Sequence, residues 1–124
     1  MRVLLVDDEK KFVMMLARRL ELRGFRTEFV NSGDEAIGLV TKGESFDVAV
    51  LDVKMPGIGG IDLQRKLEKL DPNIKFIFLT GHGSDIGNLS EVGEAALFLP
   101  KPLKINDLVE ALLVVAGKNQ GANT

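Results

Sequence analysis

Short apolar runs alternate with longer amphipathic segments along this chain. Four of the runs are nearly continuous and are bounded by charged or turn residues, which is typical of strands buried on both faces of a sheet. They occupy residues 3–6, 46–51, 76–79 and 95–99. A fifth run, residues 27–30, is more polar, as in an edge strand, and Pro100 directly after the last run favours an edge for that strand too. We therefore expect five strands.

Between these runs, apolar residues recur at helical spacing. Three sets indicate helices: Phe12, Leu16 and Leu20; Leu63, Leu67 and Leu70; and Ile105, Leu108 and Leu112. A further helix is expected to begin at Ser32, because Glu35 stands three residues later, as in a capping box. Residues 84–93 should form the remaining helix. We expect it to be short or irregular, because it contains glycine, asparagine and serine, which are poor helix formers.

This alternation of strands and helices predicts an α/β fold. Five strands alternating with five helices indicate a doubly wound parallel sheet with helices on both faces. Short connections and right-handed crossovers favour the flavodoxin-like strand order 2-1-3-4-5. In such a sheet, the carboxyl ends of the strands open onto one crevice where the winding direction switches. The residues directly after the strands are therefore the first place to look for chemistry.

The composition restricts the classes of function. The 124 residues suffice for one domain, which we place at residues 1–117, followed by a polar tail at residues 118–124. The net charge is −2, so we expect no direct binding to nucleic acid. The absence of cysteine excludes disulfides, zinc–thiolate sites and thiol nucleophiles. No apolar run is long enough for a signal peptide or a membrane span, so we expect a cytoplasmic protein without membrane association.

The predicted strand ends carry a set of charged and polar side chains. Asp7 and Asp8 follow the first strand, Asp52 the third, Thr80 the fourth and Lys101 the fifth. Neighbouring carboxylates repel one another unless a cation joins them, and oxygen ligands without His or Cys favour Mg²⁺. A metal ion beside an ammonium and a hydroxyl is suited to a phosphoryl group.

Each of these residues also has an ordinary explanation when it is taken alone. The acidic residues 7–9 would stabilise a helix N-terminus, Asp52 would be a turn residue and Lys101 a solvated surface charge. The suitable group stands at four separate strand ends, however, and this joint pattern favours the functional interpretation.

Several segments together resemble the signature of a response-regulator receiver domain of two-component signalling, of the chemotaxis-regulator type. They are residues 3–9 (VLLVDDE), 51–57 (LDVKMPG), Gly60, 79–83 (LTGHG) and 98–102 (FLPKP). The resemblance covers residues 2–116. It implies a phosphoprotein of a phosphorelay that depends on Mg²⁺ and is not a turnover enzyme on external substrates.

The resemblance implies a role for each matching acidic residue. Asp52 corresponds to the aspartate that accepts a phosphoryl group from the phosphohistidine of a sensor histidine kinase, and it also contacts Mg²⁺. Asp8 corresponds to a direct ligand of the metal, and Asp7 to a ligand that acts mainly through water. The backbone carbonyl of Lys54 corresponds to a further ligand.

The later motifs correspond to the switch. Thr80 matches the hydroxyl that moves onto the phosphoryl group, and Lys101 matches the lysine that pairs with a phosphoryl oxygen. The bond from Lys101 to Pro102 is expected to be cis. Phe98 stands where the family has its aromatic switch residue, often tyrosine, and without a hydroxyl it can switch only by packing. Pro100 stiffens the end of the fifth strand.

Two pairs of residues are expected to tune the lifetime of the phosphorylated state and the output. Lys54 and His82 stand two residues beyond the acceptor and the switch threonine, where the family borders the path of the hydrolytic water. Leu113 and Val114 lie at or among the polar positions of the last helix, and we expect them to anchor an output partner or a phosphorylation-dependent dimer. The side of this helix that faces the sheet is predicted to comprise Ile105, Leu108, Val109, Leu112 and Ala116.

Two other classes of protein remain as alternatives. A phosphatase of the haloacid dehalogenase type needs a second acid two residues after its nucleophile, and Lys54 stands at that position. A flavin- or nucleotide-binding module needs a phosphate-cradling loop after the first strand, where this chain has acidic residues. Turnover of a phosphomonoester would support the phosphatase, and a Mg²⁺-dependent reaction with acetyl phosphate would argue against the nucleotide module.

Overall fold

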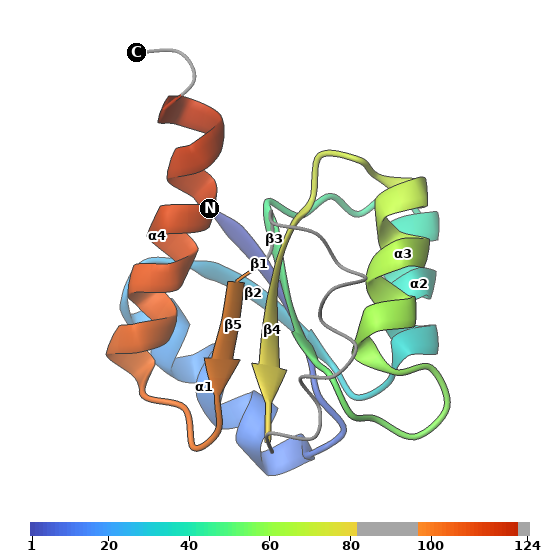
Figure 1. Ribbon diagram of the computed structural model, residues 1–124, viewed down its shortest axis with the longest axis horizontal. Coiled ribbons are helices and arrows are strands. Elements are labelled where there is room, and N and C mark those ends of the chain that lie inside the picture. The colour runs from blue at the N-terminus through green and yellow to red at the C-terminus, as the bar shows by residue number, and fades with distance from the viewer. Residues whose placement is uncertain (82–96, 122–124) are drawn as a thin grey trace.

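A computed structural model describes residues 1–81 and 97–121 of the chain (Figure 1). Its centre is a five-stranded parallel sheet in the order β2-β1-β3-β4-β5. The strands are β1 (Arg2–Val6), β2 (Arg26–Val30), β3 (Val48–Asp52), β4 (Lys75–Thr80) and β5 (Leu97–Pro100). The predicted α/β class, strand order and edge positions of the second and fifth strands are therefore confirmed.

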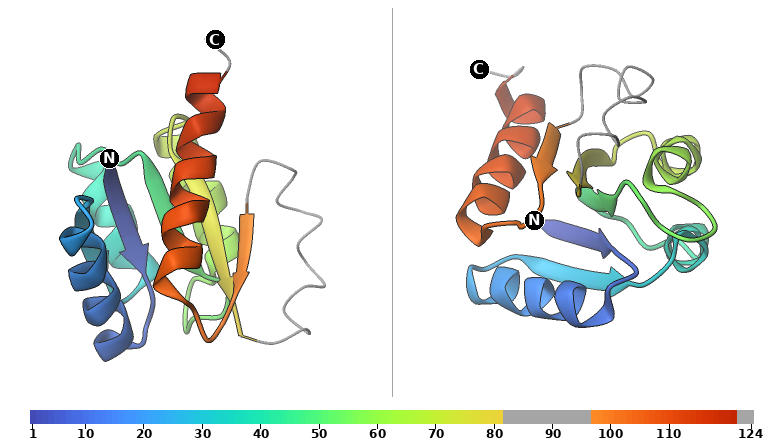
Figure 2. Two further views of the ribbon diagram at one scale, coloured as in Figure 1. Left: turned by 90° about the vertical axis from the view of Figure 1, so that its left-hand side faces the viewer. Right: turned by 60° about the horizontal axis from the view of Figure 1, so that its bottom comes forward.

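Helices cover both faces of the sheet, as predicted (Figures 1 and 2). They are α1 (Lys10–Leu22), α2 (Gly33–Thr41), α3 (Gly60–Leu70) and α4 (Ile105–Gly121). Helices α1 and α4 pack on one face and α2 and α3 on the other. The helix predicted at residues 84–93 lies outside the described residues.

The sheet separates two apolar cores, because successive side chains of a strand point to opposite faces. Val3 and Leu5 of β1 pack with α1 and α4, whereas Leu4 and Val6 pack with α2 and α3. All four side chains are almost completely buried. This burial on both faces explains why the first strand is a continuous apolar run in the sequence.

The start of α2 uses the predicted capping residues with one change of partner. The Ser32 hydroxyl accepts the Glu35 backbone N–H at 3.2 Å. The Glu35 carboxylate accepts the backbone N–H of Asn31 at 2.9 Å, whereas a capping box would use the N–H of Ser32. The pair still satisfies two donors at the entry to the helix and fixes where α2 begins.

Helix α4 differs from its predicted pattern. Leu108 and Leu112 are buried as expected, but Ala111 and Val115 complete the buried face, while Ile105, Val109 and Ala116 are only partly buried. The prediction omitted Ala111 and Val115, whereas Ile105 and Val109 pack against the same core as expected. The helix also continues to Gly121, beyond the domain boundary placed at residue 117.

Strand β3 begins two residues later than predicted, and the residues before it contact Arg2 instead. The Arg2 guanidinium lies 4.6 Å from the centre of the Phe46 ring and 2.6 Å from the Glu44 carboxylate. The Asp47 carboxylate accepts the backbone N–H of Arg2 at 2.7 Å. These contacts lie at the amino-terminal ends of β1 and β3, opposite the strand ends that carry the acidic residues.

Candidate functional site at the carboxyl ends of the strands

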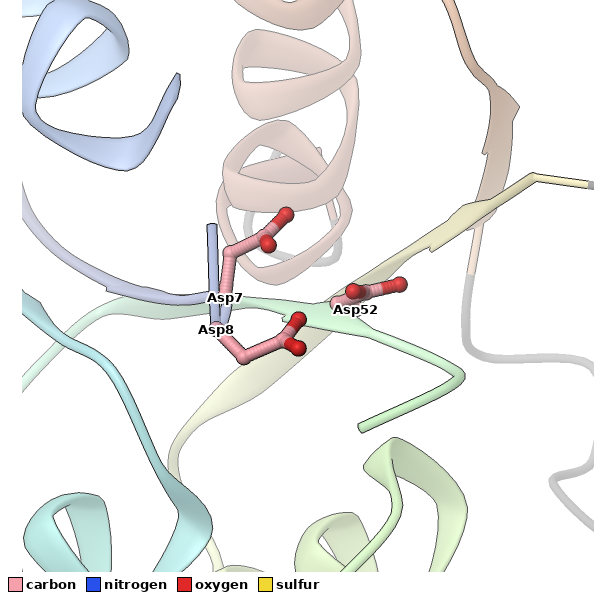
Figure 3. A group of neighbouring side chains, drawn as sticks. All are labelled: Asp7, Asp8 and Asp52. Atoms are coloured by element: carbon pink, nitrogen blue, oxygen red, sulfur yellow. The ribbon is translucent and has the colours of Figure 1, made fainter. Parts of the chain in front are cut away.

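Four strand ends bring their polar residues to one edge of the sheet. Asp7 follows β1, Asp52 ends β3, Thr80 ends β4 and Lys101 follows β5. Because all strands are parallel, these ends lie together, as the sequence predicts. The carboxylates of Asp7, Asp8 and Asp52 converge on one space (Figure 3), and each offers an oxygen within 4.8 Å of the others.

Lys101 joins this carboxylate cluster from β5. Its Nζ lies 3.0 Å from Asp7 Oδ2, 3.2 Å from Glu9 Oε1 and 3.4 Å from Asp52 Oδ2. Asp7 and Asp52 are buried, and the Lys101 side chain is also mostly buried. The ammonium therefore compensates two carboxylates that water reaches poorly.

The backbone holds both buried carboxylates in place. Asp7 Oδ1 accepts the backbone N–H of Glu9 at 2.9 Å, and Asp52 Oδ1 accepts that of Lys54 at 3.4 Å. Gly60 allows the chain after Asp52 to pass close to the start of α3. A Cβ atom at Gly60 would overlap the backbone carbonyl oxygen of Asp52, so only glycine fits there without a shift.

Burial and mutual repulsion disturb the acid–base balance of the site. Burial, together with the nearby charge of Asp7, raises the pKa of Asp52 from its usual 3.8 to about 6, against the opposing effect of Lys101. Burial also raises the pKa of Asp7, although the Glu9 N–H and Lys101 act against the increase. Burial alone would lower the pKa of Lys101, but its bond to Asp7 and the surrounding negative charge raise it instead. The site therefore has an excess of negative charge that a further cation would neutralise.

The donor set fits Mg²⁺. Three carboxylates supply hard oxygen atoms, which suit Mg²⁺ better than softer metals. Asp8 is the exposed member of the three, and Asp7 and Asp52 are buried.

The predicted switch residues lie on the two neighbouring strands β4 and β5. Thr80 is buried at the end of β4, and its carbonyl accepts the backbone N–H of Lys101 at 2.8 Å. The Lys101–Pro102 peptide bond is cis, the isomer that the resemblance implies. Phe98 is partly buried and stacks on Phe78, with 5.2 Å between the ring centres and 16° between the ring planes.

A cleft of about 770 Å³ opens beside the cluster. It brings the acidic groups together with an apolar wall that includes Phe12, Met15 and Leu103. The Phe12 ring centre lies 5.1 Å from Nζ of Lys101. Sequence reasoning missed this wall, because Phe12 was used there only as part of the apolar spacing that predicts α1. Lys54 also lines the cleft and is exposed.

The remaining predicted residues lie elsewhere. Leu113 is 57% exposed and Val114 is 46% exposed on α4, on the side away from the sheet. His82 lies outside the described residues. Within the described part of the chain, no helix is both long and apolar enough to cross a membrane.

Comparisons with known proteins agree on one family. The sequence profile of the response regulator receiver domain matches residues 3–113. The chain is 39% identical to part of the sensor kinase CckA of Brucella abortus (strain 2308), over 86% of this chain and 11% of that protein. It is 31% identical to the response regulator receiver protein CpdR of the same organism, over 93% of this chain and 98% of that protein. The structure of response regulator protein TrrA from Thermotoga maritima in complex with Mg²⁺-BeF matches with a TM-score of 0.80 at 27% identity, over 92% of this chain and 97% of that one.

The chain therefore belongs to the response regulator receiver domain family, the phosphorylated switch domains of two-component signalling. Its relatives differ widely in length. The chain spans 11% of the CckA kinase and 49% of a transcriptional regulatory protein CpxR homolog from Haemophilus influenzae.

Proposed function

We propose that Asp52 accepts a phosphoryl group from the phosphohistidine of a sensor histidine kinase. The single observation that carries this assignment is the position of its carboxylate. Asp52 ends a central strand, lies within 4.8 Å of the oxygens of Asp7 and Asp8, and has an ammonium 3.4 Å away. A carboxylate flanked by a cation site and a lysine is placed to attack phosphorus while its surroundings neutralise the phosphoryl oxygens.

The chain's own residues divide the work of the transfer. A carboxylate oxygen of Asp52 forms the new bond to phosphorus as the phosphorus–nitrogen bond breaks and the imidazole leaves. Asp7, Asp8 and the carbonyl of Lys54 would hold Mg²⁺, which neutralises phosphoryl oxygens when bound. Lys101 donates to another phosphoryl oxygen. These roles make the domain a phosphoacceptor rather than a turnover enzyme on external substrates.

The switch follows from the residues beside the new phosphoryl group. Thr80 would donate its hydroxyl to a phosphoryl oxygen, and Phe98 would change its packing against Phe78. New charge-assisted hydrogen bonds are each worth about 1.5–3 kcal/mol, which suffices to reverse a two-state balance of a few kcal/mol. The new hydrogen bonds at Asp52 and the changed packing of Phe98 would then alter the surface that contacts the output partner.

The partners in this proposal are a histidine kinase and an output domain or protein. The output face includes α4, where the exposed pair of Leu113 and Val114 offers apolar contact area among polar neighbours. Phosphorylation-enhanced self-association through the same face is part of the proposal. A cytoplasmic place of action also belongs to it, because histidine kinases draw their phosphoryl group from ATP.

Intact-mass labelling tests the proposed acceptor. Acetyl phosphate or phosphoramidate with Mg²⁺ should add one phosphoryl group to the wild type, and none to Asp52→Asn. Asp62→Asn is the matched control, because Asp62 is an exposed aspartate on α3 that contacts only Arg65 among the ion pairs described. Labelling that persists in Asp52→Asn, or that does not depend on Mg²⁺, would contradict the assignment.

A further inference from the structure

Lys101 is held from one side by a single short stretch of chain. Among the described residues, three carboxylates contact its ammonium, and the two shortest contacts are Asp7 at 3.0 Å and Glu9 at 3.2 Å, both in the connection from β1 to α1. Phe12, in the first turn of α1, places its ring 5.1 Å from the same Nζ atom. Asp52 is the most distant of the three carboxylates, at 3.4 Å.

An ammonium group has three N–H bonds in a fixed tetrahedral arrangement. Two of them are directed to Asp7 and Glu9, which determines the direction of the third. The Phe12 ring favours the cation electrostatically and blocks the side of the ammonium that it faces. The third N–H is therefore left for Asp52, where the phosphoryl group would form.

The Glu9 carboxylate is available for this contact because it does not cap its own helix. Glu9 is the N-cap residue of α1, and its backbone carbonyl accepts the Val13 N–H at 3.0 Å. Its side chain makes no capping hydrogen bond to the helix, although N-cap side chains commonly do so. The carboxylate reaches instead across 92 residues of sequence to Lys101.

We propose that Glu9 is a positioning residue that orients Lys101 toward the phosphoryl group on Asp52. This inference rests on the proposed phosphoacceptor function of Asp52. Glu9 acts through Lys101 and does not itself contact the reacting atoms. With Asp7 it fixes the ammonium before the phosphodonor arrives, so that little reorganisation is needed during the transfer.

The negative charge of Glu9 acts in the opposite direction, because it repels an anionic phosphodonor. The Glu9 side chain is 63% exposed, so water and salt screen its charge from a distant donor. Its hydrogen bond to Lys101 is local and is screened less. The positioning effect therefore outweighs the repulsion, and the two effects predict opposite results for a Glu9 variant.

The first experiment compares initial rates of Asp52 phosphorylation by acetyl phosphate with Mg²⁺. Glu9→Ala should slow labelling about threefold to tenfold. Glu9→Gln should stay within about twofold of the wild type, because its amide oxygen still accepts from Lys101. Glu110→Ala, an exposed glutamate on α4, is the matched control and should react at the wild-type rate. If both Glu9 variants react as fast as the wild type or faster, Glu9 either repels the phosphodonor or has no effect on the reaction, and the proposal is wrong.

A double-mutant cycle shows whether Glu9 acts through Lys101. In a Lys101→Met background, Glu9→Ala should change the slow residual rate by less than about twofold. An equal loss in both backgrounds would mean that Glu9 acts on the fold or on the metal site, and it would overturn the proposal. If the wild type itself is not labelled at Asp52, the proposed function fails.

A second readout needs neither phosphodonor nor metal. In the metal-free protein, the Lys101 ammonium can be recognised by proton–nitrogen NMR as the signal that Lys101→Met removes. Glu9→Ala should speed the exchange of its protons with water, and Glu110→Ala should leave that exchange unchanged. Unchanged exchange in Glu9→Ala would refute the positioning role even if Asp52 were not the acceptor.

Discussion

Replacing Asp52 with asparagine should make the metal-free protein more stable at neutral pH. The folded state keeps this carboxylate buried, with a pKa of about 6 against a usual value of 3.8. At pH 7 the carboxylate is ionised in both the folded and the unfolded chain. Its negative charge is less favourable in the folded state than in the unfolded state. Asparagine has nearly the same shape and carries no charge, so Asp52→Asn removes that cost.

The expected size of the effect follows from the pKa difference. The difference between about 6 and 3.8 corresponds to roughly 3 kcal/mol at 1.36 kcal/mol for each factor of ten. Asp52 is only 5% exposed, so solvent screening reduces this figure little. Loss of the contact with Lys101 acts against the gain, and it is already included in the net pKa. We expect a gain of about 1–3 kcal/mol, or a melting temperature higher by about 4–12 °C.

The dependence on pH gives the effect a distinctive form. Between about pH 4 and pH 6, the folded state holds a proton on Asp52 that the unfolded chain has released, so wild-type stability falls as the pH rises. The advantage of Asp52→Asn should therefore be near zero at about pH 4 and complete above about pH 7. Asp7 adds a fall of the same sign to the stability of both proteins, because its pKa is also raised by burial.

Urea unfolding in EDTA, followed by far-ultraviolet circular dichroism, measures this difference, since the chain has no Trp or Tyr for fluorescence. Adding Mg²⁺ should stabilise the wild type and reduce or reverse the advantage of the variant, because the ion binds the folded site. A variant that is no more stable than the wild type at about pH 7.5 in EDTA would refute the reasoning. An advantage that stays constant from about pH 4.5 upward would do the same.

Three further outcomes are expected. Lys54→Asn should shorten the lifetime of the phosphorylated protein, because a bulky cation beside the acceptor hinders the hydrolytic water; an unchanged loss of label by mass spectrometry would contradict this. The double variant Leu113→Glu/Val114→Glu should weaken phosphorylation-dependent association but leave labelling intact; light scattering that finds monomers in both states, together with normal partner binding by the double variant, would exclude the interface. Gly60→Ala should cost about 1–3 kcal/mol in urea unfolding, because the new methyl group meets a backbone carbonyl. Gly38→Ala, which has open space around it in α2, is its control and should not destabilise the protein.

The fold followed from the sequence wherever burial decided the residue type. The central strands are buried on both faces, and their apolar runs therefore indicated both their position and their parallel arrangement. The ends of the strands were less clear in the sequence, because Asp52 and Thr80 are the last residues of β3 and β4 but are polar, so the apolar runs stop before them. The buried face of α4 was misjudged at Ala111 and Val115, since several faces of this helix carry apolar residues.

The site was predictable as a set of strand ends but not as a set of contacts. Parallel topology alone brings Asp7, Asp52 and Lys101 together, so their meeting needed no knowledge of side-chain conformation. Which carboxylates the lysine contacts depends on rotamers and on burial. The pairing of Glu9 with Lys101 therefore had no signal in the sequence beyond an extra acid after the aspartate pair.

The stacked rings of Phe78 and Phe98 give this domain an optical use. The chain contains neither tryptophan nor tyrosine, so a single tryptophan placed at residue 98 would be its one indole chromophore. That indole would lie on β5 against Phe78 of the neighbouring strand β4, which ends at Thr80. Its emission would follow the packing between β4 and β5 in real time, without an added dye. Because phenylalanine replaces tryptophan and tyrosine throughout this chain, the emission of one introduced indole would be measured with almost no fluorescence from the rest of the protein.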